Sequence, residues 1–222
     1  MVLLATLSLA ILAFTTAQQG DILLIDGKKY SIHTNPLEGF LVKNPERRPH
    51  GSVMSSANWR GYIATWEIRD GQLLLKDVEV LVGKDQSSRL EYPGSSYGYR
   101  SVLSEVFPER SAIVADWFSG HIIVPTGKLT HYVHMGYAST YDRYLILKVR
   151  GGAVLQRWET NEAAFKKFRD SQFAAFKKTP EYQSALTEAT SGDDPLNPED
   201  AEEFIREFYS ELYMSRLFDE PK

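Results

Sequence analysis

YIATWEIRDGQLLL, residues 62–75, is the stretch that decides the fold. Its first half alternates apolar with more polar side chains, the period of a strand that buries one face. Asp70-Gly71 then supplies the positive φ angles of a two-residue type I′ turn. In that register Trp66 lies opposite Leu75, and the apolar face continues across both strands. The stretch predicts an antiparallel hairpin with Trp66 in the core.

Similar signals recur throughout residues 20–158. Asp26-Gly27 separates ILLI from KKYSI, and Gly151-Gly152 places Leu145 opposite Trp158. Further strand candidates lie at 112–118, 122–124 and 129–135, which gives about nine short strands in all. Consecutive hairpins predict a mainly β, antiparallel domain built as a sandwich, a barrel or a strongly bent sheet.

Three segments of this domain do not read as strands. Residues 43–56 are polar and contain two prolines, which predicts a surface loop. Residues 86–99, QSSRLEYPGSSYGY, also read as a loop, of a length that is often functional or mobile. Residues 101–107 are expected to form a short helix.

The period changes after Trp158, which predicts a helical tail over residues 159–222. Apolar side chains spaced along one helical face begin this tail, and Thr179-Pro180 and Asn197-Pro198 are typical helix starts. The first helix is basic and the last acidic. Two solvated faces are the simpler interpretation, and an antiparallel pair held by opposite charge is the alternative. The tail either packs on the β domain or offers a surface to a partner.

The N-terminus predicts export. Residues 1–17 carry no charged side chain, and Thr15 and Ala17 are the small residues that signal peptidases require before a cleavage site at Gln18. No Lys or Arg precedes the apolar run, so an uncleaved membrane anchor and a buried helix stay as alternatives. We expect a periplasmic or secreted protein, with membrane contact only through this segment if it is uncleaved.

Composition excludes several classes of function. The absence of cysteine excludes disulfides, thiolate metal sites and cysteine nucleophiles. A net charge of −4 disfavours nucleic acid as a partner. No phosphate-binding, dinucleotide or HExxH motif occurs, so no cofactor or metal is predicted. His131 and His134 would point to opposite faces of a strand, which makes them a poor metal pair.

Two acids beside tryptophans are the best catalytic candidates. Glu67 follows Trp66, and Asp116 precedes Trp117. Together with His121, His131 or His134 in one cleft they would suit a secreted hydrolase. Alternation places Glu67 on the polar side of its strand, where a solvent-facing role is the simpler interpretation.

Tyrosines provide the best candidate for binding. Tyr92, Tyr97 and Tyr99 lie among small, flexible residues, a composition like that of antibody-combining loops. The alternative is an ordinary mobile loop. No catalytic residue is predicted, and the partner would be a protein, a peptide or a glycan.

Residues 58–78 (NWRGYIATWEIRDGQLLLKDV) and 115–137 (ADWFSGHIIVPTGKLTHYVHMGY) resemble a family of uncharacterised bacterial β-rich proteins. The resemblance covers roughly residues 20–158 and implies no activity or catalytic residue. We therefore favour an exported, non-catalytic binding protein. The alternatives are the hydrolase and, as a special case of binding, an inhibitor or immunity-type protein.

Overall fold

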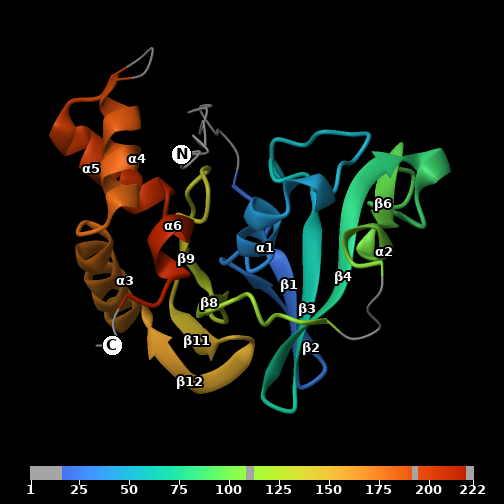
Figure 1. Ribbon diagram of the computed structural model, residues 1–222, viewed down its shortest axis with the longest axis horizontal. Coiled ribbons are helices and arrows are strands. Elements are labelled where there is room, and N and C mark those ends of the chain that lie inside the picture. The colour runs from blue at the N-terminus through green and yellow to red at the C-terminus, as the bar shows by residue number, and fades with distance from the viewer. Residues whose placement is uncertain (1–16, 109–112, 192–194, 219–222) are drawn as a thin grey trace, which may run out of the picture.

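A computed structural model describes residues 17–108, 113–191 and 195–218. Ten strands form one sheet, in which seven follow the order β2-β1-β3-β4-β12-β11-β8, β6 and β7 pair with β4, and β5 pairs with β6 (Figure 1). Their bounds are β1 Asp21–Ile25, β2 Lys28–Ile32, β3 Ile63–Arg69, β4 Gln72–Gly83, β5 Arg89–Leu90, β6 Tyr97–Ser101, β7 Ile113–Val114, β8 Gly120–Pro125, β11 Arg143–Arg150 and β12 Ala153–Asn161. β9 (Leu129–His131) and β10 (Thr140–Tyr141) form a separate pair.

The two hairpins with Asp-Gly turns form as predicted. Asp26 and Asp70 have φ angles of 51° and 53°, and the glycine after each is also positive, as a type I′ turn requires. Trp66 pairs with Leu75, and its side chain is fully buried. The stretch quoted first is therefore β3, the turn and the start of β4.

The third hairpin forms with a different register from the predicted one. Val149 pairs with Val154, but Trp158 pairs with Ile146 and not with Leu145. The cause is a β-bulge, since Leu155 is an extra residue that shifts the pairing beyond it by one. Trp158 therefore lies on the other face of the sheet from Leu145.

The sheet is mostly antiparallel but not entirely so. β1 runs parallel to β3, and the connection between β2 and β3 includes the unpredicted helix α1 (Glu38–Lys43) and the 3₁₀ helix η1 (Pro45–Arg47). The two end strands of the main path also meet. The Thr34 hydroxyl, just after β2, donates to the carbonyl of His121 and accepts from the amide of Ile123, both in β8, at 3.2 and 3.0 Å. The sheet thus curls until its ends join.

Two hydrophobic clusters lie on opposite faces of this curled sheet. In β8, Ile122 and Val124 belong to the cluster inside the sheet, whereas Ile123 packs with the C-terminal helices. β11 divides in the same way, with Leu145 inside and Ile146 against the helices. Because both faces are covered, these strands are apolar throughout.

The helical tail is therefore part of the fold. It comprises α3 (Glu162–Phe176), α4 (Pro180–Ser191), α5 (Pro198–Phe208) and α6 (Glu211–Met214), on the outer side of β8 and β11 (Figure 1). Asn197 caps α5 as predicted, by accepting from the amides of Glu199 and Asp200. None of the described helices is long and apolar enough to cross a membrane.

Opposite charges join the first and last long helices of the tail. Arg169 pairs with Glu207 at 3.2 Å and Lys177 with Glu202 at 2.8 Å. Because residue numbers rise along α3 as they fall along α5, the two helices run antiparallel. The structure therefore has the charge-paired arrangement that the sequence left as the alternative to two solvated faces.

The remaining differences concern the class and the extent of elements. The chain combines a mixed sheet of ten strands with a C-terminal helical region, so the predicted mainly β class is supported only in part. The predicted loop 86–99 contains β5 and the start of β6, and of the predicted strand 129–135 only β9 forms. The expected helix at 101–107 is α2 (Leu103–Val106). Residues 1–16, which hold most of the predicted signal, lie outside the described residues.

Gly120→Ala should release the C-terminal segment from the sheet. A Cβ at position 120 would overlap the carbonyl oxygen of Ser215, which accepts the amide of His121. We expect a loss of about 2 kcal/mol or more in the free energy of unfolding, measured with urea, as is usual for overpacking. Gly39→Ala is the control, because no atom lies near its added Cβ. A Gly120 variant as stable as the control would contradict this packing.

Candidate functional site

The three predicted binding tyrosines lie in one hairpin but differ in exposure. Tyr92, in the turn, is 61% exposed, and Tyr97, at the start of β6, is 47% exposed. Tyr99 is only 5% exposed and belongs to a small cluster with Ile63 and Leu81. The prediction that none of the three tyrosines packs in the core is therefore wrong for Tyr99. The missed signal is the alternation Tyr-Gly-Tyr, which is typical of a strand.

Close contacts hold this hairpin to the sheet through Tyr99. The Arg89 guanidinium lies 4.6 Å from the centre of the Tyr99 ring and also pairs with Glu79 of β4 at 3.0 Å. The Tyr99 hydroxyl donates to the side-chain oxygen of Gln19 at 3.4 Å. A Cβ at Gly98 would overlap the carbonyl of Arg89, so only glycine allows β5 and β6 to approach this closely.

The turn that carries Tyr92 is ordered by its own backbone. The amide of Ser95 donates to the Tyr92 carbonyl at 3.0 Å, and Gly94 has a φ of 87°. With Pro93 before that glycine, this is the pattern of a type II turn. The buried Ser95 hydroxyl accepts from the amide of Tyr97. The two exposed tyrosines therefore stand on a defined tip.

The histidines proposed for a catalytic cleft have separate surroundings. His121 is buried against the rings of Trp158 and Phe168, and its Nδ1 donates to the carbonyl of Arg216 at 3.0 Å. Burial lowers the pKa of His121. His131 is exposed on β9, and Nδ1 of the exposed His134 shares a hydrogen bond of 2.6 Å with the hydroxyl of Tyr132.

The two candidate acids, Glu67 and Asp116, also differ in their neighbours and exposure. Glu67 forms ion pairs with Lys76 at 3.2 Å and Arg69 at 3.9 Å along the β3–β4 hairpin. Asp116 is exposed after β7. Within the described ranges no group of three His, Cys, Asp or Glu side chains is arranged to hold a metal.

A small cavity lies between the sheet and the helical tail. Its volume is about 20 Å³, and His33, Tyr137 and Arg169 contribute to its wall. One water needs about 10–15 Å³, so the cavity has room for water and not for a substrate. His33 stacks on Tyr137 with 4.8 Å between ring centres, and burial lowers its pKa to about 4, so it is neutral at pH 7.

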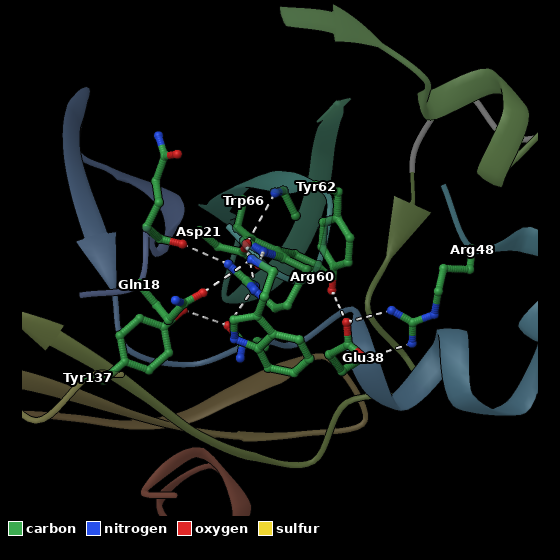
Figure 2. A network of polar contacts seen from close by, with 12 residues as sticks. Gln18, Asp21, Glu38, Arg48, Arg60, Tyr62, Trp66 and Tyr137 are labelled. Carbon is green, nitrogen blue, oxygen red and sulfur yellow. Dashed lines mark hydrogen bonds and ion pairs between the residues drawn. The ribbon is translucent and has the colours of Figure 1, made fainter. Parts of the chain in front are cut away.

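The sequence analysis missed a buried polar network around Asp21 and Arg60 (Figure 2). One Asp21 oxygen accepts from Arg60 at 3.0 Å and from the amide of Ala64 at 3.2 Å, and the other accepts from the Trp66 indole at 3.0 Å. Burial raises the pKa of Asp21, whereas the charge of Arg60 lowers it. No sequence signal connects these two residues, because 39 positions separate them.

Arg60 is bonded on its other side as well. It donates to the side-chain oxygen of Asn35 at 2.6 Å and to the carbonyl of Gln19 at 2.8 Å. Asn35 in turn accepts from the hydroxyl of Tyr137 at 3.0 Å (Figure 2). The neighbouring Tyr62 hydroxyl donates to Glu38 at 2.8 Å. Asp21 and Arg60 are bonded to one another and buried, so neither is exposed to a substrate in this structure.

Comparison with known proteins adds no assignment, because no family model, curated protein or solved structure matches the chain.

Arg60→Met should destabilise the protein by about 3–5 kcal/mol, because it leaves the Asp21 carboxylate buried without its cation. The measurement is urea unfolding at pH 7. Arg100→Met is the matched control, since Arg100 pairs with Glu105 at the surface and exposed pairs contribute about 0–1 kcal/mol. Equal losses in the free energy of unfolding for the two variants would mean that the buried pair contributes no more than an exposed one.

Proposed function

We propose that the chain is a non-catalytic interaction protein that binds a protein, peptide or glycan through the tip of the β5–β6 hairpin. The observation that supports this most is the exposure of Tyr92 and Tyr97 on a hairpin whose base is buried. Tyrosine provides a large, amphipathic contact area at a small cost in conformational entropy, and it is common among residues that dominate binding energy.

The fixed conformation of the hairpin also supports a binding role for its tip. The type II turn and the contacts of Tyr99 fix the tip before any partner arrives. A surface that is ordered in advance loses less conformational freedom on binding. An inhibitor or immunity-type protein would be one form of such a binder. For the hydrolase alternative, no observation in the described residues favours a shared cleft for Glu67 and Asp116.

We also propose that the protein is exported after cleavage before Gln18. The backbone amide of Gln18 donates to the carbonyl of Gly136 at 3.0 Å, and its side-chain amide donates to Ser56 at 2.9 Å. The side-chain contact does not depend on what precedes Gln18, and the α-amino group that cleavage creates keeps an N–H donor for the carbonyl of Gly136. Cleavage there is thus compatible with the folded domain.

Expressed from its own start codon, the mature protein should begin at Gln18 and appear outside the cytoplasm. Cell fractionation followed by mass spectrometry of the N-terminal peptide measures both. Thr15→Lys with Ala17→Lys should block cleavage, because signal peptidases need small residues at these positions. Soluble cytoplasmic protein with an intact Met1 would contradict the export proposal and leave the binding proposal untouched.

The double variant Tyr92→Ala/Tyr97→Ala should lose partner capture while the fold stays intact. A photo-crosslinking phenylalanine analogue at position 92 first identifies the captured species in a cell extract. We then expect binding of that species to fall at least about tenfold in the double variant. The free energy of unfolding should change by only about 0.5 kcal/mol per exposed site.

Tyr132 supplies the matched control, because it is an exposed tyrosine elsewhere on the surface. Tyr132→Ala should retain binding, and the crosslinker at position 132 should not capture the same species. Tyr99→Ala should instead cost about 3 kcal/mol in stability, as truncation of a buried aromatic does. Full binding by the double variant would refute the hairpin tip as the site.

A further inference from the structure

The strand β12 leaves one edge of the sheet unpaired. It pairs with β11 from Ala153 to Asn161, but its pairing with β4 is limited to Ala153 opposite Gln72. Beyond the bulge, no other strand in the described part of the chain pairs with it. Its exposed side chains along this edge are Leu155, Gln156, Arg157, Glu159 and Asn161. An open edge of this kind is a template for another strand.

The direction of the backbone groups of β12 follows from a hydrogen bond made by β11. The carbonyl of Arg143 accepts from the amide of Thr126, on the side of β11 that faces β8. Because hydrogen-bonding direction alternates along an antiparallel strand, Ile146 faces β12 and exchanges hydrogen bonds with Trp158. The neighbours of Trp158, Arg157 and Glu159, then direct their amides and carbonyls away from β11, toward the open edge.

The charges along this edge are complementary to those of a second, antiparallel copy of the same strand. Arg157 and Glu159 stand one on each side of Trp158 and carry opposite charges. Arg157 forms an ion pair of 3.6 Å with Asp26, in which the side chains are 50% and 82% exposed. An exposed pair of this kind contributes little, so it leaves Arg157 free to exchange partners.

We propose that β12 is a homodimer interface, in which the β12 strands of two copies pair antiparallel about a two-fold axis at Trp158. In this register Arg157 lies opposite the partner's Glu159, and Glu159 lies opposite the partner's Arg157. Both pairs consist of residues whose backbone groups point outward, so each forms two interchain hydrogen bonds. A two-fold axis produces both ion pairs at once, because the same surface is used twice.

Other registers lose this match. An axis placed between two residues pairs outward backbone groups with inward ones, which removes the hydrogen bonds. Moving the axis by one whole residue keeps the hydrogen bonds but places Arg157 opposite the partner's Arg157, or Glu159 opposite the partner's Glu159, so that like charges meet. Moving it by two residues toward the turn places Arg157 opposite Leu155, so the charges are no longer paired. The combination of backbone direction and charge therefore selects a second copy in one register. The opposite expectation is that these charges protect the edge and keep the protein monomeric.

Charge reversal tests the register directly. The probe is the protein itself, and its mass is measured by sedimentation velocity over a series of concentrations. The unmodified protein should form a concentration-dependent dimer. Arg157→Glu places two acids opposite each other, and Glu159→Arg places two bases opposite each other, so each single variant should raise the dimer dissociation constant at least about tenfold.

Two restorations make the test specific to this pairing. The double variant Arg157→Glu/Glu159→Arg exchanges the charges and should form a dimer like that of the unmodified protein. An equimolar mixture of the two single variants should form a heterodimer, because every acid then lies opposite a base. Asp26→Asn is the control, since it removes the partner of Arg157 within the chain and should leave the dimer unchanged.

The outcomes separate the proposal from its alternatives. A monomer at every concentration would overturn it and show that the charges protect the edge. A dimer that survives both single reversals would place the interface elsewhere. Loss of the dimer without recovery in the mixture or in the double variant would refute the register, provided that circular dichroism shows each variant folded.

Discussion

A buried carboxylate needs hydrogen-bond donors, and the rest of the structure depends on which groups donate to Asp21. Arg60 supplies the countercharge, and Trp66 and the amide of Ala64 supply the remaining donors. These contacts place β1 beside β3, which forms the parallel pair of the sheet. Through the carbonyl of Gln19 the same network reaches the residue that accepts the Tyr99 hydroxyl, at the base of the tyrosine hairpin.

Burial of both faces of β8 and β11 is the second constraint on the fold. Alternate residues of these strands pack inside the curled sheet and against the tail, so neither layer is complete without the other. Tyr144 illustrates this, because its ring stacks on Phe165 of α3 at 3.7 Å between centres. The helical tail therefore covers a face of the sheet that would otherwise be apolar and exposed.

The two proposed interaction surfaces lie where this packing ends. The sheet curls until β2 meets β8, and the helices cover β8 and β11 from outside. The tip of the β5–β6 hairpin and the free edge of β12 are left without a covering element in the described chain. One surface offers aromatic side chains, and the other offers backbone hydrogen bonds with paired charges. These are different chemistries, so they suit different partners.

The sequence by itself determined the local features of this protein. Asp26-Gly27, Asp70-Gly71 and Gly151-Gly152 specify turns, and Asn197 specifies a helix start, because each acts through residues close in the chain. It also indicated Tyr92 and Tyr97 as exposed. Only the tertiary structure decided the parallel pairing of β1, the bulge at Leu155, the burial of Tyr99 and the contact of Asp21 with Arg60. These depend on residues distant in sequence, and no local propensity or periodicity records which distant groups meet.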